Sequence, residues 1–196
     1  TQIVPKIGQQ MANTLGTTYE QFDPKTIKRI PNYDSLVGGL FETAINSLGI
    51  PFDNYDNVLR FVKIINCGKG IDIGSRHITI STCGVIPGIK KFMNEEGQVN
   101  LAISLHAPNN ALRSRIMPIN KAYPLNELME TIKEYINKTN RRVTFEYIML
   151  DNVNDSEENA KELALLLKGI NCYVNLIPYN ETENIEFKRT KEWKIF

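Results

Sequence analysis

Polar side chains follow the apolar, strand-like segments of the sequence, and their hydroxyl, imidazole and amide groups can hydrogen-bond a ligand. The candidate residues at or near these segment ends are Ser81, Ser104, Leu105, His106 and Asn180. In parallel α/β folds, ligands bind beyond the C-terminal ends of the strands. Small polar residues could instead cap the helices that follow. Because several segment ends share this polarity, the pattern favours a ligand site at one end of a sheet.

His106 has two interpretations. As a general base, it would need a pKa near the working pH and a partner that orients the ring. As a structural residue, it would make satisfied hydrogen bonds at the start of a loop. No partner motif accompanies it, so the sequence favours the structural interpretation. His77 begins a predicted strand and is also interpreted as structural.

Charged residues outside the segment ends offer two further candidates. The connection 106–123 is longer than an ordinary turn, and long connections in compact domains are often functional. It is predicted to be a surface loop over the strand ends, with Arg113 or Arg115 available to phosphate, although solvated surface charge is the alternative. Glu146 interrupts an otherwise apolar segment, so it would line a polar interior or pair with a cation, and pairing is favoured.

Metal and nucleophile motifs are absent from the sequence. There is no C-x-x-C, H-E-x-x-H, P-loop or G-x-S-x-G pattern. The three cysteines, Cys67, Cys83 and Cys172, are widely spaced and odd in number, which is typical of reduced thiols. We therefore predict neither a metal set nor a catalytic residue from these motifs.

The composition is that of a globular protein. The 196 residues include 42% hydrophobic and 23% charged residues, with a net charge of +1. These values exclude a polybasic nucleic-acid tail and an acidic disordered domain. No stretch of about 18 apolar residues occurs, and residues 1–5 lack the pattern of a signal peptide. We expect a cytoplasmic protein that is not bound to a membrane.

Strand-like and helix-like patterns alternate from about residue 54 onward. Helices are predicted at 54–66, 87–96 and 124–139, with another after a capping box at Asp155 and Glu158; strands are predicted at 77–81, 99–105, 142–150 and 172–178. This order argues for parallel strands joined by right-handed crossovers. The predicted fold class is α/β, either part of a (β/α) barrel or an open sheet. Residues 1–53 show no clear period.

Five ordered motifs resemble a known family. They are R-H-I-T-I-S-T-C-G-V-I-P-G-I at 76–89, L-A-I-S-L-H-A-P-N at 101–109, R-S-R-I-M-P-I-N at 113–120, R-R-V-T-F-E-Y-I-M-L-D-N-V-N-D at 141–155 and C-Y-V-N-L-I-P-Y-N at 172–180. They resemble the RlmN family of radical S-adenosylmethionine enzymes, which methylate C2 of an adenine in 23S rRNA and in some tRNAs. Cfr enzymes, which methylate C8 of the same adenine, share much of the pattern.

The resemblance implies a partial (β/α) barrel of the radical S-adenosylmethionine type. It implies that S-adenosylmethionine lies across the strand ends, at Ser81, at the segment Ser104, Leu105 and His106, and at Asn180. It also implies an RNA substrate (23S rRNA or tRNA), a [4Fe–4S] cluster in the intact protein, an electron donor such as flavodoxin, and a monomer.

The departures from the family pattern are also informative. The family's G-E-P motif falls at Gly49-Ile50-Pro51, so Gly49 is a candidate cofactor contact, whereas Ile50 cannot accept a hydrogen bond from an ammonium group. The C-x-x-x-C-x-x-C cluster motif and the methyl-carrying cysteine are missing. We expect residues 1–53 to be a poorly matching segment and 54–196 to be the middle-to-late part of the barrel. Such a chain would be inactive alone, and a non-catalytic barrel that binds RNA or a partner is the alternative.

Overall fold

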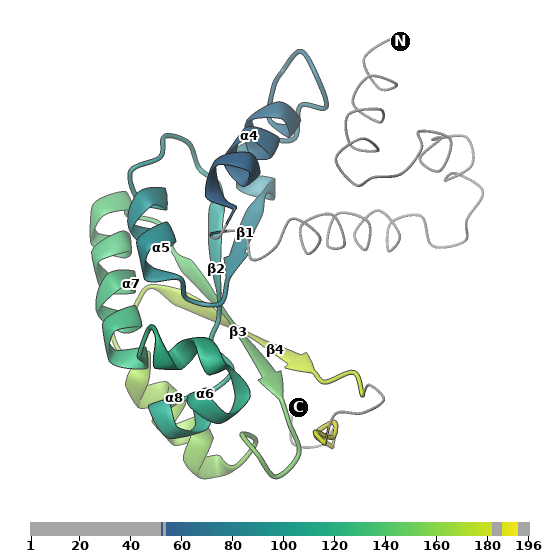
Figure 1. Ribbon diagram of the computed structural model, residues 1–196, viewed down its shortest axis with the longest axis vertical. Helices are drawn as coiled ribbons and strands as arrows, with labels where there is room; N and C mark the ends of the chain where they lie inside the picture. Colours follow the sequence, from purple (N-terminus) through teal and green to yellow (C-terminus); the bar gives the residue numbers. More distant parts are fainter. Residues whose placement is uncertain (1–51, 53, 182–185, 192–196) are drawn as a thin grey trace, which may run out of the picture. The chain divides into compact units, whose positions relative to one another are not determined.

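The computed structural model describes residue 52, residues 54–181 and residues 186–191. The chain divides into two compact units, Thr1–Gly74 and Ser75–Phe196. Figure 1 shows the elements along the chain. Gly49 and almost all of the segment 1–53 lie outside the described residues.

The described part of the first unit is a single helix and the turn after it. Helix α4 spans Tyr55–Ile65, as the sequence pattern predicts, and it buries one apolar stripe, which consists of Tyr55, Val58, Val62 and Ile65. The chain then folds back on the helix end. The backbone N–H of Ile73 donates to the carbonyl of Ile65 at 2.9 Å, and the Asn66 amide donates to the carbonyl of Ile73 at 2.7 Å.

The second unit is built on a four-stranded parallel sheet with the order β1-β2-β3-β4. The strands are β1 (Thr79–Thr82), β2 (Asn100–Ser104), β3 (Val143–Met149) and β4 (Cys172–Pro178). Each strand pairs with the next one along the chain, so every connection is a crossover with a helix or helices. The predicted alternation of parallel strands and helices is confirmed.

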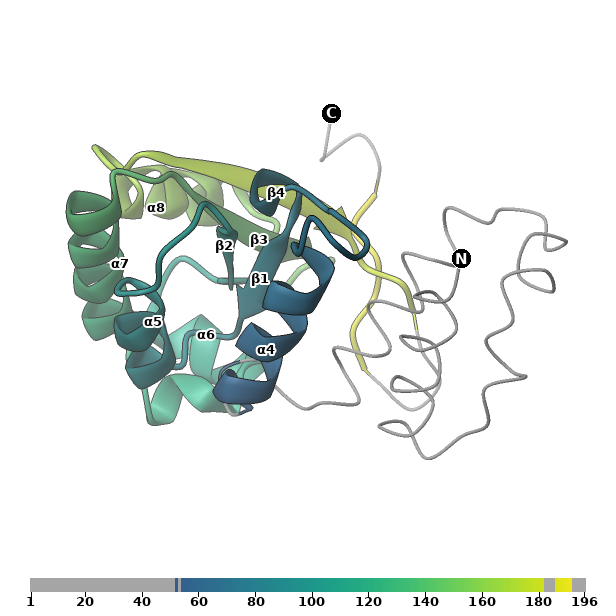
Figure 2. The same cartoon turned by 90° about the horizontal axis from the view of Figure 1, so that it is seen from above.

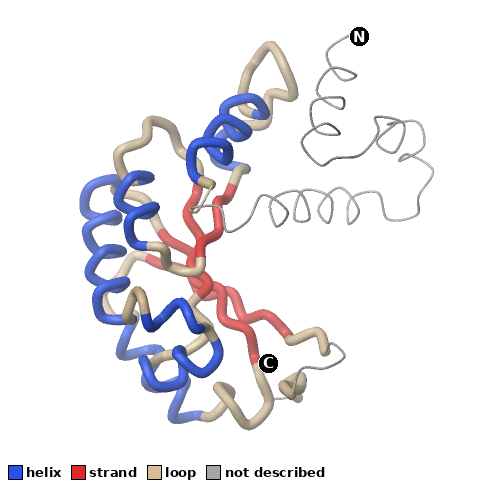
Figure 3. The backbone as a smooth tube through the Cα atoms, viewed as in Figure 1, coloured by secondary structure: helices blue, strands red, loops and turns tan. Residues whose placement is uncertain are grey.

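The helices of this unit lie on one side of the sheet, as Figures 1 and 3 show, and Figure 2 gives the same arrangement from above. They are α5 (Ile86–Phe92), α6 (Asn110–Ile116), α7 (Leu125–Thr139) and α8 (Glu157–Leu166). The short 3₁₀ helix η3 (Pro118–Lys121) lies between α6 and α7 in the chain, and the 3₁₀ helix η2 (Ser75–His77) precedes β1. A sheet covered on one side by its crossover helices is the arrangement of a partial (β/α) barrel. The helices α5–α8 leave the other face of the sheet uncovered.

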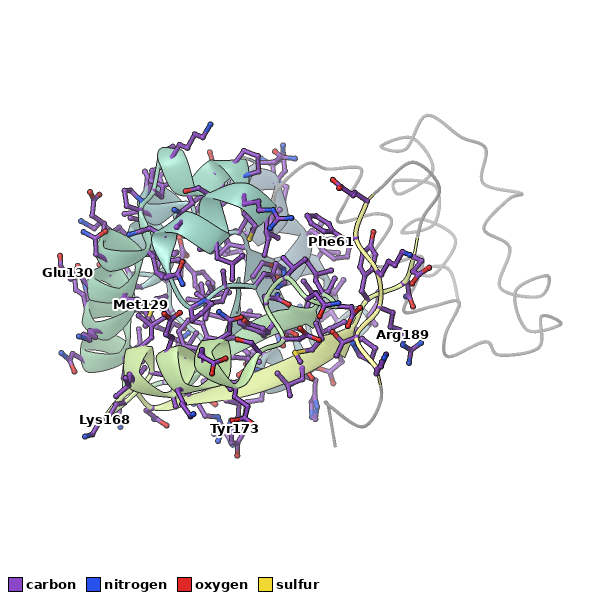
Figure 4. The ribbon with its side chains drawn as sticks, turned by 90° about the horizontal axis from the view of Figure 1, so that it is seen from below. Phe61, Met129, Glu130, Lys168, Tyr173 and Arg189 are labelled. Carbon is purple, nitrogen blue, oxygen red and sulfur yellow. The ribbon has the colours of Figure 1, made fainter. Side chains whose placement is uncertain are left out.

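The core lies between the sheet and these helices. Ile103 of β2 and Phe145 of β3 are fully buried there, and burial of one such side chain contributes about 1.5–3 kcal/mol. The rings of Phe92 on α5 and Tyr135 on α7 stack with their centroids 6.2 Å apart. Figure 4 shows Met129 of α7 directed into this layer and Glu130 directed away from it.

Three local predictions need correction. The connection 106–123 is not a surface loop, because most of it forms α6 and η3. Helix α8 is capped by Ser156, whose side chain accepts the N–H of Asn159, and not by Asp155. The Asp155 carboxylate instead accepts from the N–H of Asn152 at 2.9 Å. His77 ends η2 and does not begin β1.

Within the described part of the chain, no helix is both long and apolar enough to cross a membrane.

Candidate functional site

The predicted site residues of the second unit lie at one end of the sheet. Ser81 is in β1 and Ser104 is the last residue of β2. His106 lies two residues after the end of β2, and Asn180 lies two residues after the end of β4. Because the strands are parallel, their C-terminal ends share one edge of the sheet. The four residues are therefore at the same end, as predicted. Their role in binding stays a prediction.

Alternation along the strands places the two serines on the face away from the helices. Ser81 is exposed between the buried residues Ile80 and Thr82. Ser81 is opposite Ala102 of β2, and Ser104 follows Ala102 by two positions, so the serines share a face. This face of the sheet offers hydroxyl groups at the C-terminal ends of β1 and β2.

A row of polar residues crosses the same face. Ser104 is opposite Glu146 of β3, and Glu146 is opposite Asn175 of β4. The amide of Asn175 donates to Oε2 of Glu146 at 2.7 Å. Glu146 is thus held by a neutral amide, whereas the sequence favoured pairing with a cation. The half-buried carboxylate lines the open face.

The first strand ends in a tight turn. The buried Thr82 hydroxyl accepts from the backbone N–H groups of Gly84 and Val85, at 3.2 and 3.3 Å. Gly84 has φ +100°, and a Cβ atom there would lie 2.9 Å from Cδ2 of Leu128 on α7. Only glycine combines this backbone conformation with such a close approach. The turn therefore brings the end of β1 against the helical layer.

The backbone continues the sheet one step beyond β2. The N–H groups of Leu105 and His106 both donate to the carbonyl of Glu146, at 3.0 and 3.3 Å. The Leu105 side chain is fully buried. Its backbone N–H donates to Glu146 and its carbonyl accepts from Nε of Arg113 at 3.2 Å, so the predicted contact of Leu105 with a cofactor has no exposed or unbonded group to support it.

His106 is held in one orientation and one tautomer. Its Nδ1 accepts the backbone N–H of Ile148 at 3.1 Å, so the ring proton of the neutral form is on Nε2. Burial first, and then the charge of Arg113, lower the pKa of His106 from 6.5 to about 4, while the Glu146 backbone carbonyl acts in the opposite direction. The ring is therefore neutral at physiological pH. It can donate a hydrogen bond through Nε2, but it is a poor general base.

The backbone at His106 is also unusual, with φ +59°, a region that non-glycine residues rarely occupy. The buried Asn154 side chain stabilises this conformation. Its amide donates to the carbonyls of His106 and Ile148, at 2.8 and 2.7 Å, and its Oδ1 accepts the N–H of Leu150 at 2.8 Å. Asn154 thus joins the C-terminal ends of β2 and β3. Sequence patterns did not single it out.

The prediction for Arg113 is wrong. The sequence placed it on a surface loop near phosphate, whereas the structure buries it completely. Its guanidinium donates to backbone carbonyls at the ends of β1 and β2, and burial lowers its pKa. Arg115, two residues further along α6, is exposed. The predicted contact of Arg115 with phosphate stays a prediction.

The two cysteines of the second unit lie far apart in the sheet. Cys83 follows β1 at the C-terminal end of the sheet, whereas Cys172 begins β4 at the opposite end, as predicted. Cys67 is exposed in the other unit, and burial raises the pKa of the Cys172 thiol. Among the described residues, no group of three or more His, Cys, Asp or Glu side chains could hold a metal ion. All three cysteines of the sequence are described, and together they cannot hold an iron–sulfur cluster.

Comparison with known families identifies the barrel. The family model described as "Radical SAM superfamily" matches residues 19–164. The chain belongs to this superfamily. The parallel sheet with its helical layer is therefore part of a radical S-adenosylmethionine (radical SAM) barrel, as the resemblance implied.

Curated relatives carry one common name. The chain is 61% identical over 153 residues to a "Probable dual-specificity RNA methyltransferase RlmN" of Spiroplasma citri, covering 78% of this chain and 44% of that protein. A protein of the same name from Thermoanaerobacter sp. (strain X514) is 52% identical over 169 residues, covering 86% of this chain and 49% of that protein. The chain thus spans about half the length of these relatives.

Solved structures agree with the sequence comparison. A radical SAM methyltransferase from Sphaerobacter thermophilus superposes with a TM-score of 0.72 at 48% identity, covering 74% of this chain and 43% of that one. A domain of a pyruvate-formate lyase-activating enzyme from Bacteroides vulgatus ATCC 8482 has a TM-score of 0.54 at 16% identity, covering 75% of this chain and 84% of that one, and it shows the fold alone.

Radical SAM proteins in general use S-adenosylmethionine and a [4Fe–4S] cluster. The three cysteines of this sequence do not fit the cluster, because Cys83 and Cys172 lie at opposite ends of the same sheet. The strand ends do fit the other cofactor. They offer serine hydroxyls on the face away from the helices and a neutral imidazole at the end of β2, and S-adenosylmethionine carries hydroxyl, carboxylate and adenine groups that such side chains can bind.

Proposed function

We propose that this chain supplies the S-adenosylmethionine-binding strand ends of an RlmN-type enzyme that methylates C2 of an adenine in 23S rRNA and in some tRNAs. One observation carries the proposal. Polar side chains stand at the C-terminal ends of parallel strands, in a radical SAM chain that is 61% identical to a relative named as an RNA methyltransferase.

The chain's own residues have distinct roles in this proposal. Ser81 and Ser104 hydrogen-bond the cofactor through their hydroxyls, and the Asn180 amide does so from the end of β4. His106 donates from Nε2 to an acceptor atom, because its Nδ1 is already occupied by the Ile148 N–H. Bound S-adenosylmethionine would supply the methyl group. These residues bind and orient it on the open face.

The sequence at Gly49-Ile50-Pro51 weakens this site in the proposal. Where the family has glutamate, Ile50 cannot accept from the cofactor's ammonium group, which removes a charge-assisted hydrogen bond of about 1.5–3 kcal/mol. Gly49 would still offer its backbone to the cofactor. A cluster working with this site needs cysteines other than the three of this sequence. We therefore expect residues 1–196 alone not to methylate RNA.

The RNA-related part of the proposal concerns surface and partners. Exposed Arg115 on α6 is a candidate contact for RNA phosphate. A complete enzyme of this type would act in the cytoplasm, as a monomer, with an electron donor such as flavodoxin. Replacement of Arg115 by Ala should reduce the salt dependence of RNA binding, because fewer counterions are released.

A second candidate function is a non-catalytic barrel that binds RNA or a partner protein. The scattered cysteines and Ile50 favour it for this chain. A Cfr-type enzyme acting on C8 of the adenine is a third candidate, because Cfr enzymes share much of the motif pattern. The three differ in product. An assay that identifies the methylated adenine therefore separates them.

A chimera tests the proposal directly. The 153 aligned residues of this chain would replace the corresponding half of the Spiroplasma citri relative, which retains the remainder of its own sequence. The purified chimera would be reconstituted with iron and sulfide without oxygen and incubated with 23S rRNA, and methylated adenosines would be identified by mass spectrometry against standards. A matched chimera with Ile50→Glu restores the family's acceptor. Residues 1–196 alone serve as the third sample.

Each outcome assigns one function. 2-Methyladenosine from either chimera supports the proposal, and 8-methyladenosine assigns the Cfr type instead. A folded chimera that loads iron yet gives no product, with or without Ile50→Glu, overturns the proposal in favour of the non-catalytic barrel. Turnover by residues 1–196 alone, with four irons bound, would overturn the expectation that this sequence lacks a cluster site.

A further inference from the structure

Arg113 is a buried cation that is hydrogen-bonded by neutral oxygen atoms and not by a carboxylate. Its side chain is 0% exposed. The hydrogen bonds that its guanidinium donates go to neutral carbonyl and amide oxygens. A buried charge of this kind is costly unless hydrogen bonds satisfy it. The identity of its acceptors therefore indicates what Arg113 does for the fold.

The acceptors come from two neighbouring strand ends. Nη2 donates to the carbonyls of Cys83, after β1, and Ser104, at the end of β2, at 2.7 and 3.3 Å. Nε donates to the carbonyl of Leu105 at 3.2 Å. One rigid guanidinium thus spans the C-terminal ends of β1 and β2, beyond the last register pair between them, Thr82 and Ile103.

The surroundings hold the guanidinium in this place. Nη1 donates to Oδ1 of Asn120 at 2.9 Å, and the Asn120 amide in turn donates to Oδ1 of Asn110 and to the Ser114 hydroxyl, at 3.0 and 2.8 Å. A Cβ atom on Gly84 would lie 3.2 Å from Nη2, so the glycine leaves room for the guanidinium. The α6–η3 segment is therefore arranged around the Arg113 side chain.

We propose that Arg113 is a positioning residue of the strand-end site: it sets the spacing between the ends of β1 and β2 and so orients Ser104 and His106 toward the cofactor. The inference rests on the proposed function for the identity of the ligand. Arg113 itself does not touch the ligand, because its side chain is fully buried and each of its three nitrogens already donates to a strand end or to Asn120.

Two replacements of Arg113 test this role. Arg113→Met keeps a long unbranched side chain and removes every side-chain donor. Arg113→Lys keeps the charge but has one nitrogen in place of three, so it cannot bond Leu105 and Asn120 as well as Cys83 and Ser104. Arg115→Met on the same helix is the matched control, since Arg115 is exposed. All are made in the chain of 196 residues.

Three measurements separate positioning from simple stabilisation. Thermal unfolding reports stability. Titration with S-adenosylhomocysteine, followed by NMR so that weak binding is detected, reports ligand affinity at a temperature where each variant is folded. The ¹⁵N shifts of the imidazole groups against pH report the state of His106, and His77, the other histidine of the sequence, serves as reference in the same spectrum.

We expect Arg113→Met to weaken S-adenosylhomocysteine binding by about tenfold or more. This is the loss in affinity that follows when one hydrogen bond between the ligand and the strand-end site is no longer made. The titration midpoint of His106 should rise, because a neighbouring cation is removed. Arg113→Lys should restore the His106 midpoint more than the affinity, because Lys returns the charge without the additional bonds of Nε to Leu105 and of Nη1 to Asn120. Arg115→Met should leave both unchanged.

Failure of this inference differs from failure of the proposed function. If the wild-type chain does not bind S-adenosylhomocysteine at millimolar concentration, the proposed ligand is wrong. If the wild type binds and folded Arg113→Met binds equally well, Arg113 is purely structural and the inference is overturned. Should Arg113→Met fail to fold, Asn120→Ala, which removes one guanidinium partner and keeps the cation, decides by the same affinity criterion.

Discussion

The neutral His106 ring makes a prediction about stability in acid. In the folded chain its pKa is about 4, compared with 6.5 for an unperturbed histidine, because the ring is buried next to the Arg113 charge. The unfolded chain therefore binds an additional proton between these two pH values. A depressed folded pKa gives stability that is present above pH 6.5 and is lost as the pH falls toward 4. Replacement of His106 should remove this loss.

The structure sets the magnitude and the best replacement. At about 1.4 kcal/mol for each pKa unit, the fall from 6.5 to about 4 corresponds to a loss of about 3 kcal/mol between pH 7 and pH 4. Asn is the conservative replacement, because its Oδ1 can accept the Ile148 N–H in place of Nδ1. Asn also tolerates the left-handed backbone at φ +59° better than most residues.

Urea unfolding between pH 7 and pH 4 measures the effect. Other groups titrate in the same range, so the informative quantity is the difference between wild type and His106→Asn at each pH. The His106→Asn variant should have a lower free energy of unfolding than the wild type at pH 7, since the ring packing is lost. Between pH 7 and pH 4 this difference should change by about 3 kcal/mol in favour of the variant. His77→Asn, at an exposed position, retains His106 and should follow the wild type. A difference that stays constant with pH would refute a buried neutral imidazole at His106.

Three further substitutions have defined outcomes. Asn154→Ala removes the three hydrogen bonds of a buried side chain and should lower the free energy of unfolding by about 2–4 kcal/mol in urea titrations, and a loss under 1 kcal/mol would contradict the assigned bonds. Gly84→Ala combines φ +100° with a Cβ contact of 2.9 Å to Leu128, so calorimetry should show about 2–3 kcal/mol of destabilisation. Ile50→Glu should tighten S-adenosylhomocysteine binding by about tenfold or more, and an unchanged Kd would remove this position from the site.

The order and direction of the elements were predictable from local patterns. Strands 77–81, 99–105, 142–150 and 172–178 alternate with amphipathic segments, and the crossovers needed between them require parallel pairing. Once the strands are parallel, the residues at their C-terminal ends must share one edge. Periodicity and connectivity therefore suffice to group Ser81, Ser104, His106 and Asn180 at that edge.

Errors arose where a local pattern had two physical solutions. In α6, the buried position on the inner side of the helix is Arg113, so hydrophobic periodicity does not mark this helix. A usable signal was present in Asn109, whose side chain accepts the N–H of Leu112 as a helix cap. At the start of α8, Asp155 and Ser156 are both good caps, and the bond from Thr190 to Asp155 draws the aspartate elsewhere.

The sequence alone determined the sheet, its direction and the end of the sheet at which the candidate site residues lie, because these follow from periodicity and chain connectivity. The tertiary structure decided what Arg113 and Asn154 do. Arg113 finds its acceptors 8, 9 and 30 residues earlier in the chain, and Asn154 reaches a carbonyl 48 residues away. No local pattern encodes such contacts. Only packing reveals that a cation expected in solvent joins two strand ends, and that His106 is a neutral donor.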